Sequence, residues 1–320
     1  MVAPRQPGPL RVAFFGTPTF AVPTLDALLR SRHRVVGVVT QPDRPRGRGF
    51  AVSDAPVKAR AAAGGLPVLQ PQTLHDPAFL TAFSALHAEL AVVAAYGKIL
   101  PERVLAVPPL GFVNVHASLL PRHRGAAPIH LAIIAGDRET GVTIMRVVKA
   151  LDAGAMLAAV RRPIGPDETS DEVERDLAQI GAVLLVSTID ALMEGRVHEA
   201  PQDDRAATYA HRLTKEDGLI DWMQSADRVH NLIRGLHPWP LAYGFLDGRR
   251  LILRRAALLR DLVAPPGTVV EAGGDRFTVA AATSGVALLE IQAEGKRPMT
   301  ARAFLAGHRV APGSRFGRAP

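Results

Sequence analysis

The chain has 320 residues, enough for about two domains, and its 48% hydrophobic and 21% charged residues permit sizeable cores and exclude wholesale disorder. It has no cysteine, which excludes disulfides, thiolate metal sites and a cysteine nucleophile, and no run of about 18 uncharged apolar residues, so no membrane-spanning helix is expected. The net charge is +8, and residues 206–320 carry 16 Lys and Arg against 10 Asp and Glu, which suits a polyanionic partner unless the source simply favours arginine.

Strand-like and helical patterns alternate through the first half of the chain. Apolar side chains recur at helical spacing over Pro18–Arg30 and again over Pro77–His87. Buried strands joined by helices indicate βαβ units, so we predict a doubly wound α/β domain with a mainly parallel sheet. The predicted strands are Arg11–Phe15, Val35–Thr40, Leu90–Ala95 and Phe112–His116.

A capping box and a glycine delimit a long predicted helix. Thr169 and Glu172 have the spacing of an N-terminal capping box, apolar residues then recur at helical spacing, and Gly195 ends the pattern. The next stretch, residues 196–208, is polar and has no period, which is typical of a linker. We therefore predict one domain over residues 1–195 and a second over residues 209–320.

The pattern changes after this linker. A short helix is predicted at Ser225–Arg234, and Asp247-Gly248 is a hairpin signal. A series of short strands separated by turn residues indicates a small β-barrel, for which an OB-type barrel is one candidate. The five predicted strands are Leu241–Leu246, Leu251–Leu258, Gly267–Glu271, Arg276–Ala281 and Val286–Ile291.

Two polar side chains stand at the end of the strand predicted over Phe112–His116. Asn114 and His116 are two residues apart, so both lie on one face of the strand. The carboxyl end of a strand is where open α/β sheets bind ligands. An amide can stabilise a developing oxyanion, and an imidazole can donate or relay a proton near neutral pH, so the pair suits acyl transfer. A pattern this short also occurs for purely structural reasons.

The residues that follow extend the pattern into a longer signature. Ser118-Leu119-Leu120-Pro121, followed by Arg124-Gly125 and Pro128, resembles the signature of the folate-dependent formyltransferases. This resemblance implies a Rossmann-like catalytic domain that takes 10-formyltetrahydrofolate as formyl donor and requires no metal. It places four cofactor-binding residues beside the folate, namely Ser118, Leu119, Leu120 and Pro121.

The same resemblance implies roles for residues outside the signature. Asp152, within Val148–Gly154, matches the family's catalytic aspartate and would complete a trio with Asn114 and His116. Tyr96 and Gly97 match a turn that lines the pterin pocket through backbone groups, and a plain strand-to-loop turn is an equal alternative. A dinucleotide-binding glycine pattern is reduced to Gly16, so NAD(P) binding is disfavoured.

The acceptor of the formyl group is indicated by residues outside the trio. Arg44, Arg46 and Arg48 occupy alternate positions in a stretch that resembles the insertion loop of family members that formylate initiator Met-tRNA. Lys215–Trp222 and His237–Pro240 resemble the second domain of such members, so the OB-like barrel is expected to bind tRNA. Formyl transfer to a UDP-amino sugar and RNA binding without catalysis are the alternatives. We expect a monomer in the cytoplasm without a membrane partner, because the absence of cysteine fits a reducing compartment and no long apolar run is present.

Overall fold

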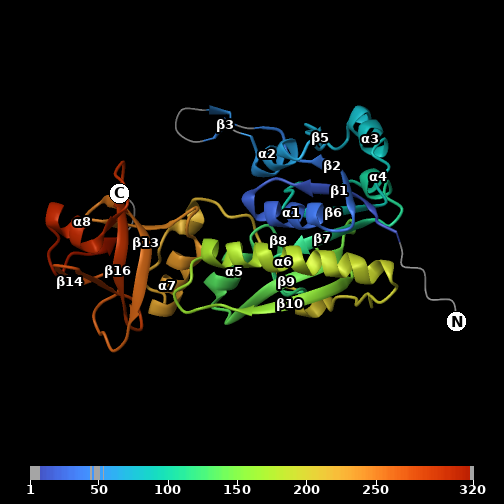
Figure 1. Cartoon of the computed structure of the whole chain (residues 1–320). Helices are drawn as coiled ribbons and strands as arrows, with labels where there is room; N and C mark the ends of the chain where they lie inside the picture. Colours follow the sequence, from blue (N-terminus) through green and yellow to red (C-terminus); the bar gives the residue numbers. More distant parts are fainter. Residues whose placement is uncertain (1–7, 44, 47–50, 53, 318–320) are drawn as a thin grey trace. The chain divides into compact units, whose positions relative to one another are not determined.

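A computed structural model describes residues 8–43, 45–46, 51–52 and 54–317 (Figure 1). The chain forms two compact units, each assembled from segments that are not contiguous in the sequence. The first unit comprises Met1–Ala126, Thr140–Arg162 and Glu174–Tyr209. The second comprises Ala127–Glu139, Pro163–Val173 and Ala210–Pro320.

The described residues of the first unit are organised around a seven-stranded sheet in the order β10-β9-β7-β6-β1-β2-β5. β1 pairs in parallel with β2 and β6, and β6 pairs in parallel with β7, whereas β7 and β9 are antiparallel. The chain starts in the middle of the sheet and winds outward both ways, so the predicted doubly wound, mainly parallel sheet is confirmed. The strands are β1 (Arg11–Gly16), β2 (Arg34–Val39), β5 (Val68–Leu69), β6 (Leu90–Ala94), β7 (Phe112–His116), β9 (Glu139–Arg146) and β10 (Met156–Pro163).

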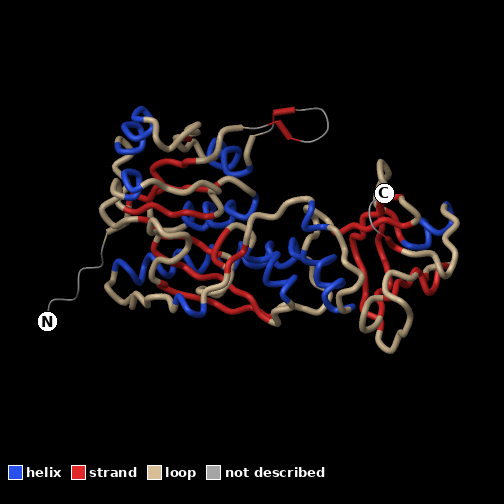
Figure 2. The backbone as a smooth tube through the Cα atoms, turned by 180° about the vertical axis from the view of Figure 1, so that it is seen from behind, coloured by secondary structure: helices blue, strands red, loops and turns tan. Residues whose placement is uncertain are grey.

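Helices cover both faces of this sheet (Figure 2). Phe83 of α3 (Pro77–Ser84) packs edge-on against Phe15 of β1, with ring centroids 5.2 Å apart, and it also meets Phe112 of β7. Val115 points from β7 to the opposite face because side chains alternate along a strand. A Cβ at Gly181 of α6 (Ser170–Met193) would lie 2.8 Å from Val115, so α6 reaches the sheet closely because residue 181 has no side chain.

The signals that delimit α6 form the predicted contacts. The Thr169 backbone N–H donates to Glu172 Oε2 at 2.8 Å, which closes the capping box. Gly195, beyond the last turn, has the left-handed φ of +67°. By length and composition α6 could cross a membrane, but Leu177 and Leu185 are fully buried within the protein. The apolar side of α6 therefore packs against the sheet of the first unit.

The remaining elements of the first unit are short. The helix predicted over Pro18–Arg30 begins as a 3₁₀ turn at Thr19–Ala21 and continues as α1 (Val22–Arg30). α3 ends three residues before the predicted His87, where the backbone turns into a left-handed φ of +48°. The other elements are α2 (Pro56–Ala63), α4 (Glu102–Leu105), β3 (Pro45–Arg46), β4 (Ala51–Val52) and β8 (Arg124–Gly125), the last paired with β11 (Tyr209–Ala210).

The second unit contains an antiparallel sheet in the order β14-β15-β16-β13-β12-β18, with β17 paired to β16. The Phe316 N–H donates to the Gly267 carbonyl at 2.8 Å, and the Val269 N–H donates to the Ser314 carbonyl at 2.8 Å. These bonds join the two ends of the sheet, so it curls into the predicted barrel-like form. The strands are β12 (Ala242–Leu246), β13 (Arg249–Leu259), β14 (Val269–Gly273), β15 (Arg276–Ala280), β16 (Gly285–Ala293), β17 (Met299–Thr300) and β18 (Phe316–Gly317).

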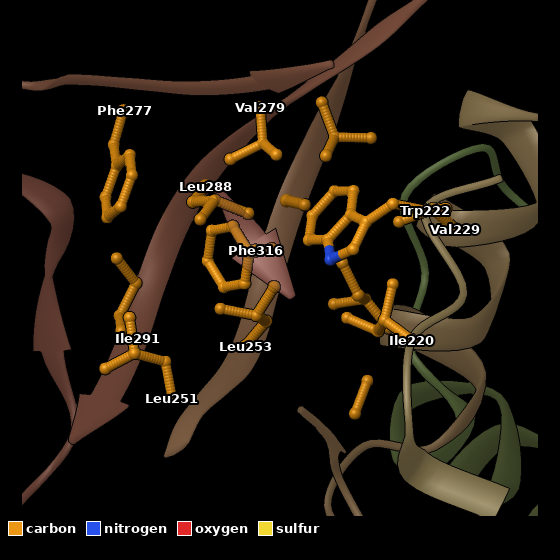
Figure 3. Packing of buried hydrophobic residues seen from close by; sticks show 14 of the residues in the cluster. Ile220, Trp222, Val229, Leu251, Leu253, Phe277, Val279, Leu288, Ile291 and Phe316 are labelled. Carbon is orange, nitrogen blue, oxygen red and sulfur yellow. The ribbon is translucent and has the colours of Figure 1, made fainter. Parts of the chain in front are cut away.

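A single apolar cluster fills this curled sheet (Figure 3). Trp222 and Phe316 meet at its centre with ring centroids 4.9 Å apart, and α7 (Ala226–Gly235) adds Val229. Asp247 and Gly248 both have positive φ, as a type I′ turn requires, so the predicted hairpin between β12 and β13 is confirmed. The unit also includes α5 (Pro128–Ala135) and α8 (Ala301–Gly307).

Candidate active site

The loops after three neighbouring strands meet at one edge of the first sheet. Gly16 of β1 pairs with Ala94 of β6, and Val93 of β6 pairs with Asn114 of β7, so these strands end at nearly the same level. Gln41 Nε2, which follows β2, donates to the carbonyl of Tyr96 at 2.7 Å. This is the carboxyl edge at which doubly wound sheets bind ligands.

Asn114 and His116 lie on one face of β7, as their spacing predicts. Asn114 is half-buried, and no hydrogen bond of its side chain is found within the described residues. His116 is only 5% exposed. A partly buried amide with no partner in the protein is available to donate to a ligand oxygen.

The structure brings Asp152 to this pair from a distant part of the chain. Asp152 lies in the turn between β9 and β10 and adopts a left-handed φ of +45°. Its Oδ2 is 3.7 Å from His116 Nδ1 and accepts a hydrogen bond of 2.9 Å from the Gly125 N–H. The predicted juxtaposition of Asp152 and His116 is therefore present.

The ring of His116 is held from both sides. Its Nε2 lies 3.0 Å from the carbonyl oxygen of His123. A carbonyl can only accept, so Nε2 donates and the ring presents Nδ1 to Asp152. At 3.7 Å, Nδ1 and the carboxylate are too far apart for a hydrogen bond, and the carboxylate lies directly beside the ring. Both contacts fix the plane of the imidazole.

The loop Ser118–Pro121 is braced by its own bonds and by one threonine. Ser118 Oγ donates to the Arg122 carbonyl at 2.6 Å. Thr143 Oγ1, on β9, donates to the Ser118 carbonyl at 2.7 Å and accepts from the Leu120 N–H at 3.2 Å. Ser118 and Leu120 are buried, whereas Leu119 and Pro121 are half-buried. Sequence reasoning missed Thr143 because a threonine inside a strand carries no distinctive signal.

Tyr96 and Gly97 occupy the turn after β6. The Tyr96 ring is buried against Phe15, with centroids 5.4 Å apart, and burial raises the pKa of its hydroxyl. Gly97 is exposed at φ +79°, and a Cβ there would lie 2.6 Å from Gln41 Nε2. The Tyr96 side chain thus belongs to the core, which leaves backbone groups and Gly97 as the parts of this turn open to a ligand.

The three arginines predicted to contact tRNA lie in or next to residues that the structure does not describe. Arg44 and Arg48 lie outside the described residues. Arg46 belongs to β3, which pairs antiparallel with β4, and its side chain is also outside the description. Next to this stretch, Lys58 Nζ forms an ion pair with Asp54 at 2.7 Å and another with Asp43.

Two further residues lie near the trio, and sequence reasoning assigned a role to neither of them. Gln202 lies in the polar stretch predicted as a linker, and Nε2 of its side chain donates to the carbonyl of Asp152 at 2.8 Å. Arg124 is buried and bonded to Gln202 Oε1 at 2.9 Å. Within the described residues, no group of three or more His, Asp or Glu is arranged to hold a metal ion.

Comparison with known proteins agrees with this architecture. Residues 10–189 match the family model described as Formyl transferase, and residues 212–309 match Formyl transferase, C-terminal domain. A doubly wound sheet with Asn114, His116 and Asp152 at its carboxyl edge, followed by a curled antiparallel sheet, thus defines a two-domain formyl transferase.

Full-length relatives narrow the class. The chain is 46% identical to the methionyl-tRNA formyltransferase of Geotalea daltonii, with 96% of this chain and 98% of that protein covered. It is 45% identical to that of Moorella thermoacetica, with 96% and 99% covered. The chain belongs to the methionyl-tRNA formyltransferase family.

Solved structures share the fold at much lower identity. An N-formyltransferase from Helicobacter canadensis, in complex with folinic acid and dTDP-3-aminofucose, matches with a TM-score of 0.67 at 14% identity, covering 87% of this chain and 98% of that one. HypX from Aquifex aeolicus, in complex with tetrahydrofolic acid, matches with a TM-score of 0.64 at 14% identity, covering 96% and 51%. These likenesses show the shared fold.

Proposed function

We propose that this chain transfers the formyl group of 10-formyltetrahydrofolate to the α-amino group of methionine on initiator Met-tRNA, giving formylmethionyl-tRNA for translation initiation. The named relatives match nearly the whole chain, including both units. The observation that carries the chemistry is the approach of the Asp152 carboxylate to the His116 ring, on the same strand edge as the free Asn114 amide.

The reaction requires a neutral amine, a donor for the developing oxyanion and a path for one proton. Model α-amino groups titrate near about 7.7–8.0, so a weak base suffices to keep the amine neutral. The amine nitrogen attacks the formyl carbon, and the formyl oxygen becomes an oxyanion. Asn114 is the first donor to that oxyanion, and His116, carrying a proton on each ring nitrogen, is the second through the Nδ1–H that faces Asp152.

Proton transfer completes the exchange. Asp152 holds the His116 ring and accepts the proton of the attacking amine, through water. The bond between the former formyl carbon and the folate nitrogen then breaks as that nitrogen takes up a proton. The oxyanion collapses to the carbonyl of the new formamide, and tetrahydrofolate leaves.

Two loops form the folate site in this proposal. Ser118, Leu119, Leu120 and Pro121 follow β7 directly, and Tyr96 and Gly97 follow the neighbouring β6. Because β6 and β7 pair in parallel, both loops emerge at the edge where Asn114 lies. Leu119 and Gly97 offer the accessible surface, whereas the buried side chains of Ser118 and Tyr96 support the loops from below.

The tRNA contacts are assigned to basic residues outside the trio. Arg44, Arg46 and Arg48 would bind phosphates near the acceptor end, and the second unit would follow the tRNA backbone. In that unit Lys296, Arg297, Arg302 and Arg309 are exposed, and no ion pair is found for them among the described residues. The division into a catalytic domain at 1–195 and a tRNA-binding domain at 209–320, and a monomeric cytoplasmic state, belong to this proposal.

An acceptor assay tests it. The chain is incubated with 10-formyltetrahydrofolate and, separately, with initiator Met-tRNA, a UDP-amino-arabinose and glycinamide ribonucleotide. We expect formylation of Met-tRNA alone. Formylation of the sugar nucleotide but not of the tRNA would refute the assigned acceptor, and absence of turnover with every acceptor would refute the catalytic function.

A further inference from the structure

The backbone of Asp152 is held by one side chain from far along the sequence. Gln202 Nε2 donates to the Asp152 carbonyl at 2.8 Å and to the Gly154 carbonyl at 2.7 Å. These two bonds use both N–H groups of the amide. The segment from Asp152 to Gly154 is therefore clamped across its turn by a single group.

The orientation of the Gln202 amide is set by Arg124. The Arg124 Nε–H donates to Gln202 Oε1 at 2.9 Å, and an arginine nitrogen can only donate. The amide oxygen must therefore face Arg124, which turns both amide hydrogens toward the two carbonyls. Arg124 is itself 3% exposed, and its Nη2 donates to Asp204 at 2.8 Å, so its guanidinium has a second partner besides Gln202.

The turn needs such a clamp for a physical reason. Asp152 has a left-handed φ of +45°, a conformation that a residue with a Cβ rarely adopts unless its surroundings impose it. Gly154 packs so tightly that a Cβ there would lie 1.9 Å from the Arg146 carbonyl oxygen. In this backbone conformation the Asp152 carboxylate reaches both the Gly125 N–H and the imidazole of His116.

We propose that Gln202 is a positioning residue of the formyl transfer site, which acts by holding Asp152 in the conformation that presents its carboxylate to His116. Arg124 acts one step further out by orienting the Gln202 amide. The inference rests on the proposed catalytic role of Asp152. It also assigns a function to part of residues 196–208, which their polar, aperiodic sequence alone presents as a linker.

Two substitutions remove the clamp in different ways. Gln202→Met keeps a side chain of similar length but has no hydrogen to donate. Gln202→Glu keeps an acceptor for Arg124 but sets a carboxylate against two carbonyl oxygens. Initial rates over both substrates separate kcat from KM, and thermal melting checks that each variant folds. Glu199→Gln is the matched control, because Glu199 lies in the same segment but pairs with Arg146 at 2.7 Å.

We expect kcat to fall by about 10–100-fold in both Gln202 variants, because a displacement of a catalytic group by about 1 Å costs that much, while KM changes little. Glu199→Gln should behave as the parent. In an Asp152→Asn background, adding Gln202→Met should lower kcat by less than about twofold, since the group being positioned is already lost.

The outcomes separate this inference from the catalytic proposal. Folded Gln202 variants with the kcat of the parent, or an effect of Gln202→Met that multiplies fully with Asp152→Asn, would overturn the positioning role while leaving Asp152 in place. Asp152→Asn with near-normal turnover would overturn the catalytic role of Asp152 and the positioning role with it.

Discussion

At the scale of single residues, the trio contains two groups that the protein holds and one that it leaves free. His116 is bonded to the His123 carbonyl and faces Asp152, and Asp152 accepts from the Gly125 N–H. Asn114 has no side-chain partner within the described structure. A donor without a partner in the protein has no protein hydrogen bond to break when it turns to a developing oxyanion, which favours electrostatic stabilisation.

Replacing Asn114 tests whether its amide stabilises the oxyanion. Asn114→Ala should lower kcat by about 10²–10³-fold, the usual loss for one oxyanion donor, with little change in KM for the folate. Steady-state rates with initiator Met-tRNA measure both constants. Asn231→Ala serves as the control, because it removes an amide in the second unit that accepts from Arg234 at 2.9 Å and has no other side-chain bond within the described residues. Near-normal turnover by Asn114→Ala would exclude this residue as the donor.

At the scale of secondary-structure elements, the three residues of the trio lie on elements of unequal rigidity. β7 is an interior strand, paired with β6 on one side and β9 on the other, so Asn114 and His116 are fixed by two ladders of hydrogen bonds. Asp152 stands on a turn, which has no such ladder and depends on side chains from other segments. The bonds from Gln202 supply the missing restraint.

The start of α6 offers a test by pH. Hydrogen bonds from the Thr169 hydroxyl and backbone N–H, and then from Arg255, lower the pKa of Glu172 from 4.5 to about 2. Its carboxylate therefore stabilises the folded state fully above pH 4.5, and this contribution is lost as the pH falls toward 2. We expect Glu172→Gln to melt about 2–4 °C below the parent at pH 7.

The difference in melting temperature between Glu172→Gln and the parent should stay constant from pH 6 to about pH 5 and then narrow as the pH falls toward 3. Glu271→Gln provides the comparison, because its pair with Arg276 is exposed on both sides and should contribute little at any pH. If the difference in melting temperature between Glu172→Gln and the parent stays constant from pH 6 to pH 3, ionisation of the Glu172 carboxylate does not stabilise the folded state.

At the scale of the whole molecule, charge and chemistry are distributed differently along the chain. The trio lies in the first unit, whereas the larger excess of basic residues lies in residues 206–320. Binding of a polyanion through many exposed cations releases counterions and is therefore strongly salt-dependent. Such a division allows affinity for the tRNA body to be provided by residues that take no part in formyl transfer.

The salt dependence of tRNA binding measures the contribution of the basic stretch at residues 41–50. The triple variant Arg44→Ala, Arg46→Ala, Arg48→Ala should weaken binding and reduce the slope of log K against log salt by about 2–3, if each arginine neutralises one phosphate. Arg30→Ala is the control, because Arg30 is exposed at the end of α1, next to the amino ends of the strands. An unchanged slope in the triple variant would exclude this stretch as a phosphate contact.

Features that depend on neighbours along the chain could be predicted from the amino-acid sequence. Period and composition predicted the strands and helices of the first sheet, the capping box of α6, and the hairpin at Asp247-Gly248, because each is a local balance of burial and backbone geometry. The spacing of Asn114 and His116 likewise placed both on one face of β7.

Contacts between groups that are distant in the sequence could not be predicted from its local pattern and are known from the three-dimensional fold. The short distance from Asp152 to His116, the burial of the Tyr96 ring and the bonds from Gln202 to the Asp152 turn all join segments that are far apart in the chain. Such contacts are selected by the packing of the whole sheet and not by local pattern. A polar, aperiodic stretch therefore looks like a linker in the sequence and becomes part of the site only when the fold is complete.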